Sequence, residues 1–244
     1  MTKTSAVIIL GMHRSGTSSL AGSLQQAGLF LGKVFEANPF NKKGNRESAE
    51  IMKLNTDVLQ YNGGDWDRPP ASISWTEDHA VRRDSILQSL SSGGARVWGF
   101  KDPRTTLTLP FWREAIKDVQ LVGTFRHPLS VAKSLNQRDK FALENGVHVW
   151  YMYNVRLLQY LTENEFPLLC FDVGGAEYAN DLHRVCTYLA LDCESGKETS
   201  FFDPTLRHQS TFQEEDSLPD VVRDLYVSLM KIYRAQSHSG STQL

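Results

Sequence analysis

The chain has 244 residues, of which 41% are hydrophobic and 22% charged, and its formal net charge is -2. This length and composition suit one globular domain with a well-buried core. A charge so close to zero excludes a chain-wide attraction to nucleic acid or to an anionic membrane, so any anion site must be a local feature. We expect one domain over residues 1–235 and a polar, disordered tail over residues 236–244.

The apolar runs are too short for a membrane span, and the first of them leads straight into a loop, unlike a signal peptide. The three cysteines, Cys170, Cys186 and Cys193, lack the spacing of a zinc or redox site, and we interpret them as free thiols in a reducing compartment. The sequence therefore predicts a cytoplasmic protein with no membrane span and no nucleic-acid partner. It does not predict an oligomeric state.

A glycine-bounded loop near the amino terminus is the most informative stretch. The apolar run over residues 6–10 leads into a loop between Gly11 and Gly16, and a helix is expected over residues 17–27. Strand, glycine loop and helix together form a cradle for phosphate, because backbone N–H groups and the positive end of the helix dipole point into the loop. The candidate anion-binding residues are His13, Arg14, Ser15, Gly16, Thr17 and Ser18.

The loop resembles a nucleoside triphosphatase P-loop in its glycine spacing but lacks that motif's lysine. Thr17 stands at the lysine position, and the cation comes earlier, at Arg14. A P-loop lysine contacts the β- and γ-phosphates of a triphosphate. Its absence favours a smaller anion held by Arg14, the hydroxyl side chains and the backbone.

Strands and helices alternate along the rest of the chain. An irregular segment over 29–46 precedes a helix over 47–61, a loop over 62–70 and a helix over 77–90. A strand over 96–100, a helix over 105–116 interrupted at Pro110 and a strand over 119–125 follow. A helix starting at Pro128, a helix over 147–163, a strand over 166–171 and helices over 176–191 and 219–235 complete the chain. This alternation predicts a three-layer α/β fold like that of P-loop nucleoside triphosphate hydrolases, with a central, mostly parallel sheet flanked by helices.

Polar clusters follow three of the predicted strands. They are the glycine loop after the first strand, residues 101–104 (Lys-Asp-Pro-Arg) after the second, and Arg126 with His127 after the third. Ligands of parallel sheets bind outside the carboxyl ends of the strands. We therefore expect the three clusters to meet at one edge of the sheet.

Three of these motifs together resemble PAPS-dependent sulfotransferases, which have a P-loop-type fold and use 3′-phosphoadenosine 5′-phosphosulfate (PAPS). The Arg-Ser-Gly-Thr run at 14–17 is similar to their 5′-phosphosulfate loop, and Arg126 with Ser134 is similar to their 3′-phosphate site. Lys-Asp-Pro at 101–103 resembles the tyrosylprotein and some carbohydrate sulfotransferases. The matches extend from Gly11 to Ser134.

The resemblance implies a sulfotransferase that moves a sulfuryl group from PAPS to an acceptor hydroxyl, with PAP as the second product and no metal. A carbohydrate or a small metabolite is the expected acceptor. Arg14 and Lys101 would stabilise charge on the transferring group and the leaving group, and Glu47 would be the general base. Alternative bases are His13, Asp102, His127 and His148.

Several features leave other interpretations open. The best-known cytosolic branch has lysine where Arg14 stands and carries an Arg-Lys-Gly segment that is absent here; residues 202–208 would lie in its place. A P-loop kinase is one alternative, because residues 168–172 resemble a Walker B strand ending in Asp172. A non-catalytic nucleotide-binding module is another. Arg104 and Arg138 are additional candidate cations, and Trp66 and Trp75 are candidate stacking residues for an acceptor.

Overall fold

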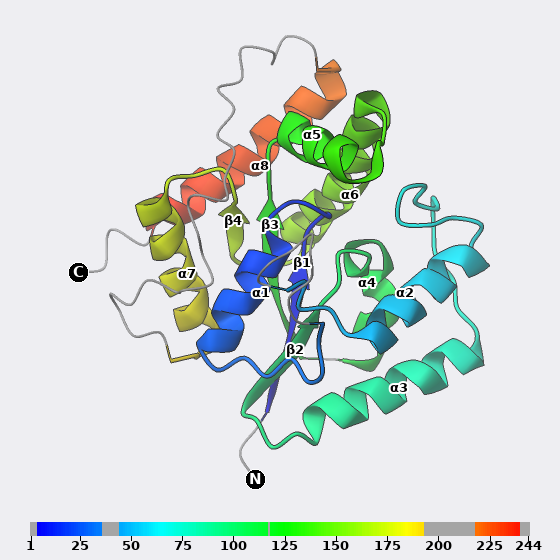
Figure 1. The fold of residues 1–244 in the computed structure, drawn as a ribbon. Coiled ribbons are helices and arrows are strands. Elements are labelled where there is room, and N and C mark those ends of the chain that lie inside the picture. The colour runs from blue at the N-terminus through cyan, green and yellow to red at the C-terminus, as the bar shows by residue number, and fades with distance from the viewer. Residues whose placement is uncertain (1–3, 36–43, 117, 193–217, 240–244) are drawn as a thin grey trace.

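A computed structural model describes residues 4–35, 44–116, 118–192 and 218–239. Its four strands, all parallel, form one sheet in the order β2-β1-β3-β4 (Figure 1). The strands are β1 (Ser5–Leu10), β2 (Val97–Lys101), β3 (Val119–Phe125) and β4 (Leu168–Cys170). Ile9 of β1 lies beside Lys101 on one side and Val122 on the other, so the strands reach the same edge together. The predicted α/β fold class is confirmed.

Successive side chains of β1 are buried on opposite faces of the sheet. Ile8 and Leu10 belong to one apolar cluster, Val7 and Ile9 to another, and all four are fully buried. Such alternation with no polar face is expected of a parallel strand covered on both sides. Helices α1 (Thr17–Gln26) and α7 (Gly175–Leu189) pack on the second cluster (Figure 1).

The helices on the first cluster form the larger part of the molecule. They are α2 (Ala49–Tyr61), α3 (Glu77–Ser91), α4 (Thr105–Ala115), α5 (Pro128–Asp139), α6 (Leu143–Glu163) and α8 (Asp220–Ser239). Pro128 is the first residue of α5, as the sequence predicted, because a proline there loses no helix hydrogen bond. No helix in the described part of the chain is long and apolar enough to cross a bilayer.

Helices α4 and α6 differ from their predicted course. Helix α4 continues through Pro110, where the sequence predicted an interruption. Its neighbours Leu109, Phe111 and Trp112 are fully buried, so tertiary packing outweighs the local cost of the proline. Helix α6 begins at Leu143, four residues before the predicted start.

The C-terminal helix also extends further than predicted. Residues 236–239, assigned to the disordered tail, belong to α8. The side chain of Gln236 accepts a hydrogen bond from the Leu168 N–H at 2.8 Å and donates one to the Phe166 carbonyl at 2.9 Å. It thereby satisfies backbone groups at β4, a tertiary contact that the local sequence does not reveal. Residues 240–244 lie outside the described chain.

The interpretation of all three cysteines as free thiols is wrong for one of them. Cys186 is disulfide-bonded, whereas Cys170 is free and buried, and burial raises the pKa of its thiol to about 12. Cys193 lies outside the described residues. Because one cysteine is disulfide-bonded, the cysteines no longer support a reducing compartment.

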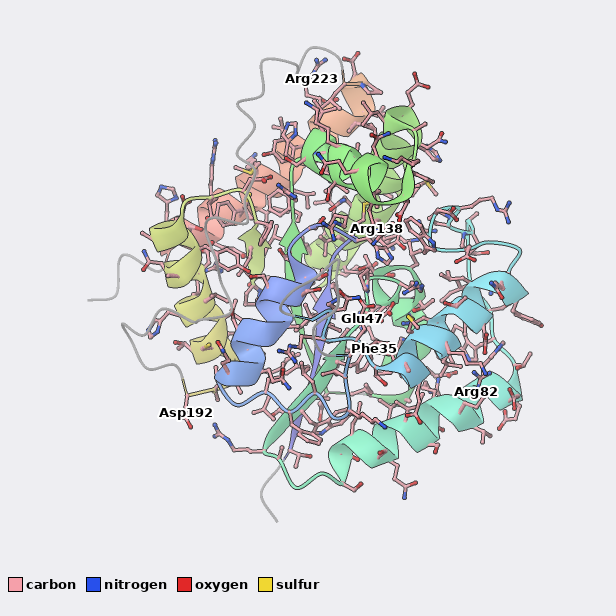
Figure 2. All side chains as sticks on the ribbon, viewed as in Figure 1. Phe35, Glu47, Arg82, Arg138, Asp192 and Arg223 are labelled. Atoms are coloured by element: carbon pink, nitrogen blue, oxygen red, sulfur yellow. The ribbon has the colours of Figure 1, made fainter. Side chains whose placement is uncertain are left out.

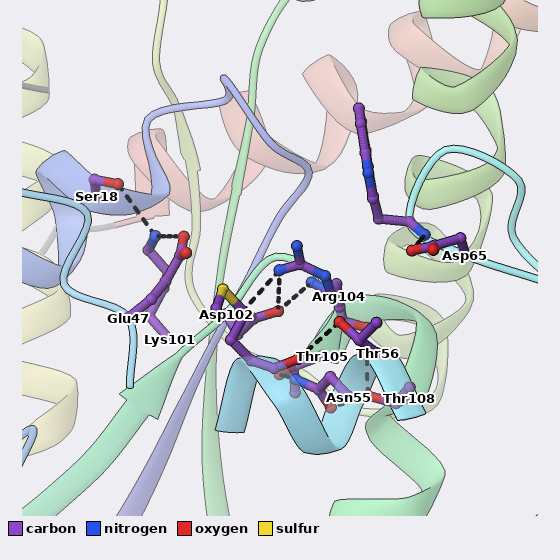
Figure 3. A network of polar contacts seen from close by, with 12 residues as sticks. Ser18, Glu47, Asn55, Thr56, Asp65, Lys101, Asp102, Arg104, Thr105 and Thr108 are labelled. Carbon is purple, nitrogen blue, oxygen red and sulfur yellow. Dashed lines mark hydrogen bonds and ion pairs between the residues drawn. The ribbon is translucent and has the colours of Figure 1, made fainter. Parts of the chain in front are cut away.

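A buried amide joins α2 to α4 (Figure 3). Asn55 donates to the Thr105 hydroxyl at 2.9 Å, and its carbonyl oxygen accepts from Thr108 at 2.7 Å and from the Trp112 indole at 2.8 Å. Asn55, Thr105 and Thr108 are fully buried, so each group depends on the others for its hydrogen bonds. The network holds the start of α4 against the helix that follows Glu47.

We expect Asn55→Ala to lower the free energy of unfolding by about 2–4 kcal/mol, because it leaves several buried polar groups without partners. Urea denaturation measures this. Asn164→Ala is the matched control, since its amide makes one long contact of 3.5 Å at the surface. Equal unfolding free energies for the two variants would contradict a structural role for this network.

Candidate functional site

Threonine side chains from two other elements hold the glycine loop. The Gly11 N–H donates to the Thr106 hydroxyl at 2.9 Å, and the Thr124 hydroxyl donates to the Ser15 carbonyl at 3.0 Å. Both threonines are fully buried. The loop is therefore fixed by α4 and β3 and leaves little freedom for its backbone. Neither threonine was predicted from the sequence, because a threonine in a helix or a strand carries no local signal of a contact with a distant loop.

The end of the loop is shaped for close approach. Gly16 has φ +83° and is the N-cap of α1, and a Cβ there would lie 2.1 Å from the ring of Phe171. Helix α1 has no side-chain cap and no acidic residue in its first turn. The positive end of the α1 dipole is therefore not neutralised by a carboxylate of its own first turn. A helix N-terminus of this kind can bind phosphate or sulfate.

Arg14 adds a partly buried cation to this loop. It has φ +66°, an uncommon conformation for a residue with a side chain, which is concentrated at functional sites. Its Nε donates to the Ser134 hydroxyl at 2.8 Å, and within the described chain it forms no ion pair. Burial, followed by the nearby charges of Arg138 and Arg126, lowers the pKa of Arg14. An anion bound here would relieve that repulsion.

Lys101, Glu47 and Ser18 form a buried polar contact beside the loop (Figure 3). The Lys101 ammonium donates to the Glu47 carboxylate at 2.7 Å and to the Ser18 hydroxyl at 3.1 Å. Lys101 is only 1% exposed and Glu47 9% exposed. One cation thus links a carboxylate to the first turn of α1, and three segments distant in sequence meet at the expected sheet edge.

Glu47 does not open a helix as predicted, since α2 begins at Ala49. It lies in extended backbone that pairs with Phe35: the Phe35 N–H donates to the Glu47 carbonyl at 2.9 Å, and the Arg46 N–H donates to the Phe35 carbonyl at 3.2 Å. Figure 2 shows Glu47 and Phe35 close together near the middle of the molecule. Glu47 is therefore placed by backbone pairing and by Lys101, just before the N-cap of α2.

Arg126 and Ser134 are not bonded to each other. The Arg126 Nε donates to Asp172 at 2.9 Å, and its guanidinium lies 5.5 Å from the centroid of the Phe171 ring. Ser134 is occupied by Arg14. Asp172 also accepts from the His127 N–H at 2.7 Å, so this carboxylate anchors the segment after β3. The sequence drew attention to Asp172 only as a Walker B acid.

The alternative bases are placed differently from Glu47. Asp102 is fully buried and accepts from the Arg104 N–H at 2.8 Å and from its guanidinium, and burial raises the pKa of Asp102. His127 accepts from the Leu129 N–H at 3.2 Å as the cap of α5, and His148 is exposed on α6. Of the five candidates, Glu47 is the one bonded to Lys101.

No protein-family model and no curated protein matches this sequence. Several solved structures resemble it over nearly its whole length, among them the following three. A sulfotransferase domain from the curacin biosynthetic pathway is 13% identical, with a TM-score of 0.57, and the match covers 94% of this chain and 99% of that one. The sulfotransferase domain of the Synechococcus PCC 7002 olefin synthase is 14% identical, with a TM-score of 0.53 and coverage of 100% and 97%. Sulfotransferase STF9 of Mycobacterium avium is 13% identical, with a TM-score of 0.58 and coverage of 98% and 77%.

The chain has the sulfotransferase fold. The glycine loop follows β1 and Arg126 follows β3, as the sequence predicted, whereas Lys101 is the last residue of β2 and Glu47 precedes α2. The described residues contain no group of three or more histidine, cysteine, aspartate or glutamate side chains that could hold a metal ion.

The two tryptophans predicted as stacking residues, Trp66 and Trp75, lie in different places. Trp66 packs edge-on against the His13 ring, with centroids 4.9 Å apart, and lies next to Phe141 and Arg138. Trp75 lies instead against Phe111. Only Trp66 therefore borders the glycine loop.

Proposed function

We propose that this protein transfers a sulfuryl group from PAPS to the hydroxyl of a small metabolite or carbohydrate. The observation that carries the proposal is the buried Lys101, which joins the Glu47 carboxylate to Ser18 at the start of α1. A cation and a carboxylate beside an anion cradle are what an in-line transfer of a charged group to a hydroxyl requires. The shared fold supports the same assignment.

The residues of the glycine loop fit a phosphosulfate. Gly16 allows close approach at the unmatched positive end of α1, and Arg14 has no carboxylate partner among the described residues. We assign the phosphosulfate to Arg14, Thr17, Ser18 and the loop backbone. We assign the 3′-phosphate to Arg126, whose Nε donates to Asp172, together with Ser134, whose hydroxyl accepts from Arg14.

Bound PAPS supplies the sulfuryl group and leaves as PAP. In the transfer, the acceptor oxygen forms a bond to sulfur while the bond between sulfur and the phosphate oxygen breaks, and the acceptor proton passes to Glu47. Lys101 holds the Glu47 carboxylate through a hydrogen bond of 2.7 Å and is positioned to stabilise negative charge that develops near Ser18. Arg14 stabilises charge on the sulfuryl and phosphate oxygens.

Two further observations weigh against an ATP-dependent kinase. Asp172, the acid that a kinase would need for its metal, is bonded to Arg126 and to the His127 N–H. Thr17 remains in place of the P-loop lysine. A non-catalytic module would have no need for a buried carboxylate paired with Lys101, whose desolvation is costly.

The direct test is PAP formation from PAPS in the presence of a panel of hydroxylated metabolites and sugars, followed by chromatography. We expect PAP to form faster with at least one acceptor than with none, and we expect chelators not to slow it. No acceptor-dependent PAP formation, combined with ATP-dependent modification of the same panel, would replace this proposal with the kinase.

A further inference from the structure

Three buried polar atoms without hydrogen-bond partners gather beside the glycine loop. They are Nε2 of His13, Nε of Arg104 and the hydroxyl of Tyr153. They come from the loop after β1, the loop after β2 and helix α6. The His13 and Tyr153 ring centroids are 6.1 Å apart, and the Arg104 charge acts on both residues. Each unpaired buried polar group costs about 1–3 kcal/mol, so three together in one place require an explanation.

The charges around this cluster indicate the kind of ligand that would satisfy it. Burial and then the cations Arg104, Arg138, Lys101 and Arg14 lower the pKa of His13, so its ring stays neutral. The proposed function assigns two of these cations, Lys101 and Arg14, to the donor. Arg104 and Arg138 remain, each with part of its guanidinium paired to a carboxylate, Asp102 and Asp139 respectively. The Arg104 Nε–H and the Tyr153 O–H are nevertheless buried donors without an acceptor in the described chain.

We propose that His13, Arg104 and Tyr153 bind an anionic group of the acceptor, which is therefore a hydroxyl compound carrying a carboxylate or a comparable anion. This inference rests on the proposed function, because it uses the cations left over from donor binding. Two hydrogen-bond donors and a neutral imidazole fit an oxyanion, and Arg138 adds a second cation next to Trp66.

Trp66 marks the side from which such an acceptor would approach. Two aromatic rings of the described chain contact His13: Tyr153 is fully buried and Trp66 is half-buried. The Trp66 ring also contacts Phe141 and lies 5.8 Å from the Arg138 guanidinium carbon. Apolar rings with one charged group between them suit an acceptor with a flat or apolar body and a single anion.

The test compares two probes that differ in charge and hardly in shape, 4-hydroxybenzoate and the neutral 4-hydroxybenzamide. The protein is titrated with each by calorimetry, with and without saturating PAP. We expect the carboxylate to bind about tenfold or more tightly than the amide to the PAP-loaded protein. Equal affinities would overturn the inference and leave three groups that only a buried water satisfies.

Tyr153→Phe separates a ligand contact from a structural role. It removes an unpaired buried hydroxyl, so we expect an unchanged or higher melting temperature together with severalfold weaker binding of 4-hydroxybenzoate. Tyr151→Phe, on the same helix, is the matched control. A lower melting temperature with unchanged carboxylate affinity would overturn the inference. If the wild-type protein does not bind PAP, the proposed function fails, and the probe comparison in PAP-free protein still decides this inference separately.

Discussion

Replacing Lys101 by methionine should lower the turnover of PAPS by about two orders of magnitude or more, the scale of losing one donor that stabilises the transition state. The same change leaves the Glu47 carboxylate buried without its partner, which destabilises the fold by about 3–5 kcal/mol. Activity and stability must therefore be measured together, by PAP formation and by thermal unfolding.

The double variant Lys101→Met with Glu47→Gln separates the two effects. It contains no unpaired charge at this position, so we expect it to recover most of the lost stability and none of the lost activity. Glu47→Gln alone keeps an oxygen for Lys101 to contact but removes its counter-charge, so we expect a lower melting temperature together with strongly reduced turnover. Lys53→Met, at an exposed position of α2, is the control. A double variant that regains both stability and turnover would show that the pair is only structural.

Gly16→Ala should weaken PAP binding by about tenfold or more and lower the melting temperature. The alanine Cβ would lie 2.1 Å from the Phe171 ring, so the ring or the loop must move, and φ +83° strains any residue with a side chain. Phe171 also lies against Arg126, so its displacement would reach a second proposed phosphate contact. Calorimetric titration with PAP and a thermal melt measure the two effects.

Gly28→Ala is the matched control for that prediction. Gly28 has φ +104°, yet a Cβ there would meet no atom within 4 Å. The control therefore carries the backbone strain without the contact, and it should reduce stability modestly with PAP affinity unchanged. If the two alanine variants have equal PAP affinity, the shape of the loop at Gly16 does not matter for donor binding.

The sequence predicted the fold well because the signals were local and repeated. Apolar runs such as residues 6–10, followed by amphipathic helices, predict a parallel sheet, and the structure has one. The predictions that failed concern residues whose conformation depends on tertiary contacts. Pro110 stays helical because its neighbours are buried, and Gln236 belongs to α8 because it bonds to Leu168 and Phe166 across the fold.

The sequence predicted which residues lie at the candidate site better than it predicted which of them bond to each other. The rule that ligands bind at the carboxyl ends of parallel strands gathered Arg14, Lys101 and Arg126 in advance. No spacing along the chain reveals that Ser134 bonds to Arg14, or that Arg126 bonds to Asp172. Such pairs depend on which side chains meet across the sheet edge, over separations of 120 and 46 residues.

The supporting groups were the hardest to foresee. Thr106 and Thr124 hold the glycine loop through single hydrogen bonds, and threonines in a strand or helix carry no signal of that use. Tyr153 lies within the helix predicted over residues 147–163, but the sequence does not reveal that its buried hydroxyl would stand unpaired beside His13.

The central claim, a site for PAPS, is tested most directly by calorimetric titration of the purified protein with PAP and, separately, with ATP and Mg²⁺. We predict PAP binding that needs no metal, that is clearly tighter than ATP binding, and that weakens in Arg126→Ala. Binding of ATP with Mg²⁺ and no preference for PAP would contradict the account.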